Sequence, residues 1–93
     1  MAAPVRVLVI DDDVNLRQTL ALVLEHAGYV VTASPNAREG LCCLEKQAFD
    51  LVFLDIAMPE TDGLALLPQL RQRYPHIPVM ILTGNALPDP TNE

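Results

Sequence analysis

The chain has 93 residues, 51% of them hydrophobic, and carries twelve acidic against six basic side chains, for a net charge of −6 at pH 7. This length supports one small domain, and the hydrophobic share excludes a disordered chain. The negative charge argues against direct nucleic-acid binding by this chain alone, because no basic patch can be assembled from so few cations.

Membrane insertion and export are not expected. Charged residues interrupt every apolar run before it reaches the length of a membrane span. The N-terminal segment MAAPVRVLVI lacks the charged start and the cleavage site of a signal peptide. A cytoplasmic location is therefore the expectation.

The first third of the chain predicts a strand, a helix and a second strand. Residues 5–10 form a short run rich in β-branched side chains, and their lack of alternation predicts burial on both faces, as in a parallel sheet. Residues 15–27 carry apolar side chains at helical spacing, and Gly28 follows as the expected C-terminal cap. Residues 29–33 are the expected second strand.

The second helix is expected to begin at a Ser-Pro pair. The side-chain oxygen of Ser34 would cap it, and Pro35 would take the first helical position. Apolar residues at helical spacing carry this helix to about Gln47. A third continuous apolar strand follows at 51–54 and ends at Asp55.

A third helix and a fourth strand complete the pattern. Residues 61–63, Thr-Asp-Gly, open a helix that runs to about Tyr74. Pro68 lies inside it and should kink the helix or delay its start, because proline lacks a backbone donor. Residues 79–82 form the fourth strand. Residues 85–93 hold two prolines and no periodicity, so they are expected to be a loop or a disordered tail.

The alternation of strand and helix predicts an α/β fold with a parallel sheet and right-handed crossovers. The periodic pattern stops after Thr83. One domain is therefore expected over residues 1–84.

Polar residues close three of the expected strands. The first runs into Asp11, Asp12 and Asp13, the third ends at Asp55 and the fourth at Thr83. In an open α/β sheet, ligands bind beyond the carboxyl ends of the strands. If the first and third strands are neighbours, Asp11, Asp12 and Asp55 converge. Such a cluster needs either a raised pKa or a bound cation, and its oxygens suit Mg²⁺.

A cluster of this kind can carry phosphoryl chemistry. An aspartate can act as the nucleophile and form an acyl phosphate, while a metal neutralises the phosphoryl group. The Thr83 hydroxyl could then hydrogen-bond a phosphoryl oxygen. The alternative is that the acids only cap helices. We prefer that interpretation for Asp13, but not for Asp12 and Asp55, because an acid that closes a buried strand is costly to keep.

Three segments resemble the receiver domain of two-component response regulators: VLVIDDD, LVFLDIAMPETDG and PVMILTG. The second is the most specific, because it joins a strand-final aspartate to a Met-Pro turn and an Asp-Gly helix start. All three occur in the family's order and cover residues 5–84. The resemblance implies a doubly wound, flavodoxin-like parallel sheet with strand order 2-1-3-4.

The resemblance also implies roles for individual residues. Asp55 would be the phosphorylated residue, and Thr83 would be the switch hydroxyl. Asp11 and Asp12 would hold Mg²⁺, and the metal would also contact Asp55 and the backbone carbonyl of Ala57. The phosphoryl donor would be a sensor histidine kinase or a histidine phosphotransfer protein.

The chain departs from the family pattern after Thr83. Receivers continue with a fourth helix, a fifth strand that ends in a phosphoryl-contacting lysine, and a fifth helix. This fifth βα unit is missing here, and the single lysine, Lys46, is expected on the opposite side of the fold. The fourth strand would be an open edge, so the folded form is not expected to be a simple monomer. Two copies could pair as a homodimer at that edge or swap elements, or the rest of the receiver could come from another chain.

Two functions fit these observations. The first is phosphorelay signal transduction, with Asp55 as a phosphoryl acceptor and not as part of a turnover enzyme. The second is a receiver remnant that binds protein partners without being phosphorylated. A Mg²⁺-dependent phosphatase is disfavoured, because Ala57 stands where such enzymes carry a second acid. Nucleotide binding is disfavoured too, because no glycine-rich loop follows the first strand.

Overall fold

The computed structural model of the chain describes residues 3–56 and 63–82. Strands and helices alternate there as predicted: β1 (Arg6–Ile10), α1 (Val14–His26), β2 (Val30–Ser34), α2 (Ala37–Lys46), β3 (Leu51–Asp55), α3 (Gly63–Arg73) and β4 (Val79–Leu82). Pro68 lies inside α3 as predicted. The expected helix start at 61–62 and the expected tail at 85–93 lie outside the described residues.

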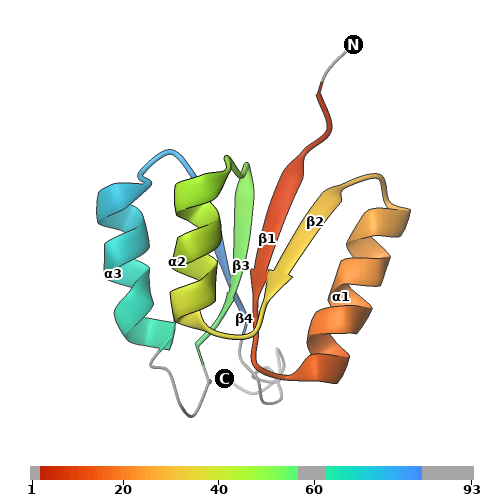
Figure 1. Cartoon of the computed structure of the whole chain (residues 1–93), viewed down its shortest axis with the longest axis horizontal. Helices are drawn as coiled ribbons and strands as arrows, with labels where there is room; N and C mark the ends of the chain where they lie inside the picture. Colours follow the sequence, from red (N-terminus) through yellow and green to blue (C-terminus); the bar gives the residue numbers. More distant parts are fainter. Residues whose placement is uncertain (1–2, 57–62, 83–93) are drawn as a thin grey trace, which may run out of the picture.

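The four strands pair in parallel, in the order β2-β1-β3-β4. This confirms the doubly wound α/β fold and its predicted strand order. The chain moves from β1 to β2 in one direction and then from β2 to β3 and β4 in the other. Right-handed crossovers therefore place α1 on one face of the sheet and α2 and α3 on the other. Figure 1 shows α2 and α3 beside one another and α1 apart from them.

The main core lies between the sheet and the layer formed by α2 and α3. It consists of nine buried apolar side chains: Leu8, Ile10, Ala37, Leu44, Phe49, Val52, Leu54, Leu66 and Leu70. The two layers approach closely at Gly40. A Cβ atom at Gly40 would lie 2.5 Å from Cδ1 of Ile10, so α2 packs against β1 at a distance that only glycine allows.

On the opposite face, α1 covers β1 without being buried itself. Val7 and Val9 of β1 are fully buried, yet α1 contains no buried residue, and Leu22 and Val23 are 67% and 59% exposed. The helix ends as predicted before Gly28, whose φ of 103° favours glycine. The helical spacing is confirmed, but much of the apolar surface of α1 stays open to solvent.

The start of α2 differs from the prediction. Ser34 is the last residue of β2, where it pairs with Ile10 and is buried. The cap is Asn36, whose side-chain oxygen accepts a hydrogen bond from the backbone N–H of Glu39 at 2.8 Å. The local Ser-Pro signal was wrong because pairing with β1 holds Ser34 in the sheet.

β4 is an edge strand of the described sheet. It pairs with β3, and within the described residues its other side has no strand partner. Met80 and Ile81, on opposite faces of the strand, are 51% and 39% exposed. An uncharged apolar strand is thus accessible at its edge and partly on both faces.

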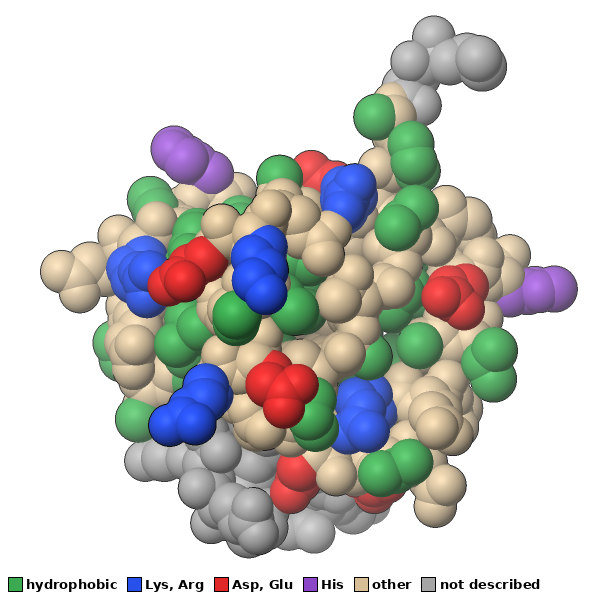
Figure 2. All heavy atoms as spheres, in the orientation of Figure 1, with side chains coloured by type: hydrophobic (Ala, Val, Ile, Leu, Met, Phe, Trp, Pro, Cys, Tyr) green, Lys and Arg blue, Asp and Glu red, His purple; other side chains and the backbone are tan. Residues whose placement is uncertain are grey.

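The charged side chains are dispersed on the face that Figure 2 shows. Lys and Arg alternate there with acidic and apolar side chains and do not form a stripe. None of the helices in the described residues has the length and hydrophobicity to cross a membrane.

Candidate functional site

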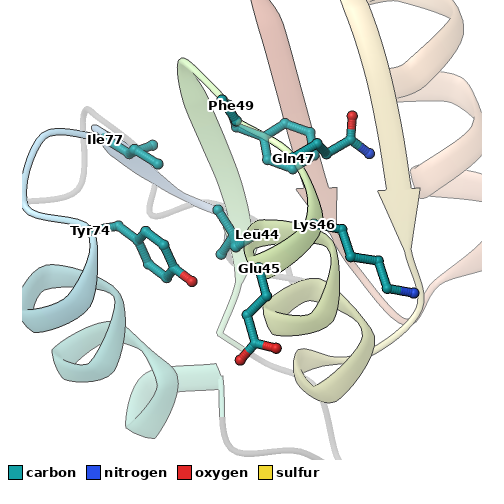
Figure 3. A pocket seen from close by; sticks show the side chains of 8 residues that line it. Leu44, Glu45, Lys46, Gln47, Phe49, Tyr74 and Ile77 are labelled. Atoms are coloured by element: carbon teal, nitrogen blue, oxygen red, sulfur yellow. The ribbon is translucent and has the colours of Figure 1, made fainter.

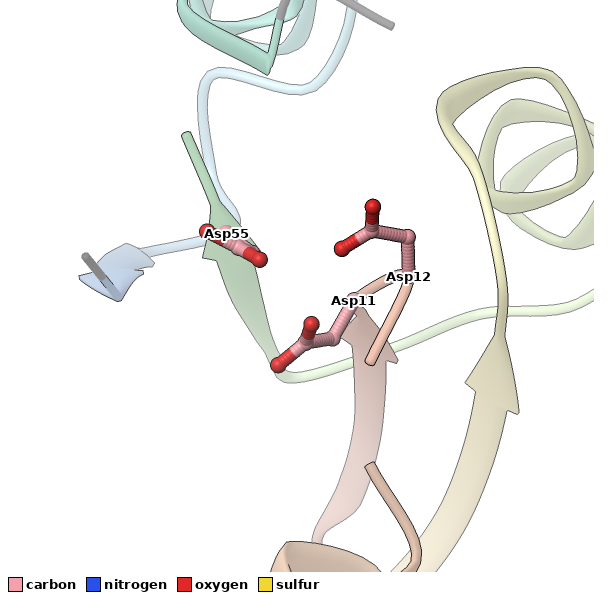
Figure 4. A group of neighbouring side chains, drawn as sticks. All are labelled: Asp11, Asp12 and Asp55. Carbon is pink, nitrogen blue, oxygen red and sulfur yellow. The ribbon is translucent and has the colours of Figure 1, made fainter. Parts of the chain in front are cut away.

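The pairing of β1 with β3 brings acidic residues of both strands together. Ile10 pairs with Leu54, and an aspartate follows each of them. Carboxylate oxygens of Asp11, Asp12 and Asp55 lie within 4.8 Å of one another. Figure 4 shows Asp11 and Asp12 extending from the end of β1 towards the side on which Asp55 lies. The predicted convergence of the three acids is therefore present.

Asp11 is anchored at three of its atoms. Its backbone N–H donates to the carbonyl oxygen of Ser34 at 3.1 Å, which extends the ladder between β1 and β2. Its Oδ1 accepts from the backbone N–H of Asp13 at 2.9 Å. Its carbonyl oxygen accepts from Nη1 of Arg17 at 2.8 Å. The contact with Arg17 was not predicted from the sequence.

Asp13 belongs to the helix and not to the acidic cluster. It is the N-cap of α1, and its Oδ1 accepts a hydrogen bond from the backbone N–H of Leu16 at 3.1 Å. The structure thus confirms the helix-cap interpretation for Asp13. The acidic cluster therefore consists of Asp11, Asp12 and Asp55.

The cluster combines two buried acids with one exposed acid. Asp11 is completely buried, Asp55 is 2% exposed, and Asp12 is exposed. The pKa of Asp11 is raised from its ordinary value of 3.8 to about 6; burial is the largest cause, and the neighbouring charges of Asp55 and Asp12 contribute to the same rise. The N–H of Asp13 opposes this shift, because it stabilises the charged form of Asp11.

One oxygen of the cluster lacks a donor. Within the described residues, Oδ2 of Asp11 is buried and has no hydrogen-bond partner. Buried polar atoms normally have a partner, so this oxygen is suited to a proton shared with Asp55 or to a cation. Three carboxylates, one of them open to water, form the oxygen-rich and partly hydrated donor set that Mg²⁺ prefers. The residues present therefore fit a Mg²⁺ ion.

Two predicted site residues, Ala57 and Thr83, lie outside the described residues, so their roles stay predictions. The neighbouring backbone is described. Leu82 pairs with Asp55 across β3 and β4, and the N–H of Ile56 donates to the carbonyl oxygen of Leu82 at 3.0 Å. The end of β4 therefore lies alongside Asp55.

A pocket of about 450 Å³ lies away from the acids, at the C-terminal ends of α2 and α3. Figure 3 shows four of the side chains that form its apolar part: Leu44, Phe49, Tyr74 and Ile77. Lys46 is also among the lining residues. The helices run antiparallel to the strands. Their C-terminal ends therefore lie beside the N-terminal ends of the strands, whereas Asp55 lies at the C-terminal end of β3. As expected, Lys46 is not part of the acidic site.

The fold and the site together define a class of protein: an open, doubly wound α/β domain with an acidic cluster at the carboxyl ends of two adjacent parallel strands. The family model for the response regulator receiver domain matches residues 7–92. The chain belongs to the receiver-domain family of response regulators, the phosphoacceptor class of two-component signalling.

Individual relatives agree with this assignment. The DNA-binding transcriptional regulator NtrC of Salmonella typhimurium is 42% identical over 80 residues, which are 86% of this chain but 17% of that protein. The chemotaxis protein CheY4 of Vibrio cholerae has a similar structure, with a TM-score of 0.84 and 32% identity over 92% of this chain and 73% of that chain. The chain thus spans about a sixth of NtrC.

A second similar structure was solved with ligands. The response regulator TrrA of Thermotoga maritima, in complex with Mg²⁺-BeF, has a TM-score of 0.81 and 33% identity, over 88% of this chain and 71% of that chain. The same protein in complex with histidine kinase ThkA has a TM-score of 0.80 and 30% identity, over 95% and 77% of the two chains.

Proposed function

We propose that this chain is the phosphoryl acceptor of a phosphorelay and that Asp55 is the residue phosphorylated. Asp11, Asp12 and the backbone carbonyl of Ala57 would hold Mg²⁺ beside it, and the hydroxyl of Thr83 would bind a phosphoryl oxygen. The observation that carries the proposal is the convergence of three carboxylates within 4.8 Å at the ends of β1 and β3.

The chemistry assigned to Asp55 is a simple displacement. One carboxylate oxygen attacks the phosphorus atom of the donor, and the bond from phosphorus to the donor's leaving atom breaks as the new phosphorus–oxygen bond forms. The product is a mixed anhydride on Asp55, and the leaving atom takes the electron pair. When bound, Mg²⁺ would neutralise charge on the phosphoryl oxygens. Each chain accepts one phosphoryl group, so it is a reactant and not a turnover enzyme.

We propose that the protein donor of the phosphoryl group is a phosphohistidine protein, either a sensor histidine kinase or a histidine phosphotransfer protein. The complex of TrrA with its histidine kinase supports this class of donor. The Mg²⁺-BeF complex of TrrA supports Mg²⁺ as the metal. We place the reaction in the cytoplasm, where such donors draw on ATP. A protein-binding remnant that is never phosphorylated is less favoured, because Asp11, Asp12 and Asp55 are all in place.

Incubation with acetyl phosphate tests the proposal without a cognate kinase. In the presence of Mg²⁺, intact-mass spectrometry should detect the addition of one phosphoryl group, with acetate as the leaving group. The adduct should be absent when EDTA replaces Mg²⁺, because the charge on the incoming phosphoryl group is then not offset. A folded chain that acquires no adduct in Mg²⁺ would contradict the proposal and favour the binding-only alternative.

A homodimer through the edge of β4, or through swapped elements, is the second part of the proposal. The edge strand has no charged residue, and Met80 and Ile81 are exposed on its two faces. A twofold axis normal to the sheet would pair two β4 strands antiparallel. This arrangement puts the acidic sites of the two copies at opposite ends of the pair, which limits their repulsion.

Ile81→Lys should make the chain monomeric. A lysine at this edge would have to be desolvated in the dimer without a partner, so the dissociation constant should rise by about tenfold or more. Leu22→Lys is the control, because Leu22 is 67% exposed on α1, away from β4. Light scattering at micromolar concentration measures both variants. A parent chain that is already a monomer under these conditions would exclude the dimer.

A further inference from the structure

We propose that Arg17 is a positioning residue of the acidic site: its guanidinium holds the backbone at the end of β1 and so sets where the carboxylates of Asp11 and Asp12 stand. The inference rests on the proposed function for its Mg²⁺ ligands. Arg17 does not itself bind the metal or the phosphoryl group in this assignment.

Arg17 contacts the carbonyl oxygen of Asp11, which lies between β1 and α1. β1 ends at Ile10 and α1 begins at Val14, so the carbonyl of Asp11 lies beyond the described strand and before the helix. Nη1 of Arg17 donates to this carbonyl oxygen at 2.8 Å. The donor is charged, which makes this hydrogen bond stronger than one between neutral groups. Arg17 thereby ties the first turn of α1 to the strand end that carries the acids.

The placement of the Arg17 side chain supports a specific role. No residue of α1 is fully buried, and large apolar side chains such as Leu22 and Val23 project into solvent. Arg17 is half-buried, as are Leu20, Ala21 and Leu24, so it lies on the side of α1 that faces the sheet, and its guanidinium contacts the turn that precedes the helix. The backbone N–H of Arg17 also donates to the carbonyl of Asp13 at 2.8 Å, so its main chain and its side chain both contact this turn.

The position of the Asp12 carboxylate depends on the local backbone more than that of the Asp11 carboxylate does. The side chain of Asp12 forms no hydrogen bond or salt bridge with the described residues. Its carboxylate is therefore positioned mainly by the turn that Arg17 holds. Mg²⁺ demands near-octahedral geometry at short distances, so a small displacement of this carboxylate weakens the site. Groups that orient metal ligands typically change metal affinity by about 10- to 100-fold when they are removed.

The direction in which the Mg²⁺ affinity changes distinguishes a positioning role of Arg17 from a purely electrostatic one. Arg17→Gln removes a positive charge near three carboxylates, and charge alone would make Mg²⁺ bind more tightly. Loss of positioning makes Mg²⁺ bind more weakly. We expect the dissociation constant for Mg²⁺ to rise by about tenfold in Arg17→Gln, measured by NMR titration of the full chain. Arg17→Lys should remain within about threefold of the parent, because an ammonium can also donate to a single carbonyl oxygen.

Two further measurements complete the test. Arg38→Gln removes an exposed arginine of α2 and should leave the Mg²⁺ affinity unchanged. In the metal-free protein, Arg17→Gln should speed hydrogen exchange of the Asp13 amide by about tenfold, because this amide is bonded to Oδ1 of Asp11 in the same turn. An equal or tighter Mg²⁺ affinity in Arg17→Gln, or unchanged exchange of the Asp13 amide, would overturn the assignment of Arg17.

Failure of the proposed function would be distinguishable from failure of this inference. If the parent chain bound no Mg²⁺, the proposed phosphoacceptor site would be wrong. The exchange rate of the Asp13 amide would still decide whether Arg17 holds the turn. If the parent bound Mg²⁺ and Arg17→Gln bound it equally well, only the inference about Arg17 would be wrong.

Discussion

Asp55→Asn should reduce phosphoryl incorporation from acetyl phosphate below detection while the chain remains folded. The amide of asparagine is a poor nucleophile compared with a carboxylate, and no other residue should replace it at the end of β3. The substitution keeps the size of the side chain and removes one of three crowded charges. We therefore expect the thermal unfolding midpoint in EDTA to be equal to or higher than that of the parent.

A matched substitution just before the same strand provides the control. Asp50 precedes β3 at the opposite edge of the sheet, where its Oδ2 accepts from the backbone N–H of Arg6 at 2.9 Å. Asp50→Asn should therefore keep the parent's phosphoryl incorporation. Retention of the adduct in Asp55→Asn, with a folded chain, would mean that another group is the acceptor.

Asp11→Asn should stabilise the metal-free chain at neutral pH. The pKa of Asp11 is raised from 3.8 to about 6 in the folded state, so the folded chain binds a proton there more tightly than the unfolded chain does. The stability that protonated Asp11 contributes is fully present below about pH 4 and is lost as the pH rises through about 6. The shift corresponds to a difference of roughly 3 kcal/mol, which is the upper limit of the gain from the neutral amide.

Denaturant unfolding in EDTA between about pH 4 and about pH 8 measures this difference. The parent should lose stability across this range relative to Asp11→Asn, because asparagine does not titrate. Glu25→Gln, which changes an exposed carboxylate near the far end of α1, should follow the parent. Added Mg²⁺ should stabilise the parent more than Asp11→Asn, because the substitution removes one metal ligand. Parallel pH profiles for the parent and Asp11→Asn would refute the proposed electrostatic coupling.

Much of the fold could be predicted because its signals are local and repeated. Continuous apolar runs marked the parallel strands, and helical spacing with Gly28 marked the end of α1. The start of α2 could not be read in the same way. Ser34 carries a local helix signal, but its backbone pairs with β1 beside Ile10 and Asp11, and its hydroxyl donates to the carbonyl oxygen of Asn36. Pairing with β1 therefore decided whether Ser34 ends β2 or caps α2.

The convergence of the three acidic side chains could be predicted for a different reason. The carboxyl ends of parallel strands lie on the same side of the sheet. The acidic residues that follow β1 and β3 are therefore close together when these two strands are neighbours. Arg17 could not be found by this argument, because its contact is between a side chain and a backbone carbonyl six residues earlier. An arginine in the first helical turn after a strand-final acid is the pattern that could have indicated it. The solvent exposure of the apolar side chains of α1 could not be predicted either. Helical spacing identifies the apolar face of a helix, but it does not show whether another element covers that face.

The most direct test of the account is the location of the phosphoryl group. The chain would be incubated with acetyl phosphate and Mg²⁺, and borohydride would then reduce the acyl phosphate to an alcohol, which converts the modified aspartate into homoserine. Peptide mapping by tandem mass spectrometry would identify the converted position. The account predicts homoserine at Asp55 and unchanged aspartate at Asp11 and Asp12. Homoserine at Asp11 or Asp12, or at none of the three, would contradict it.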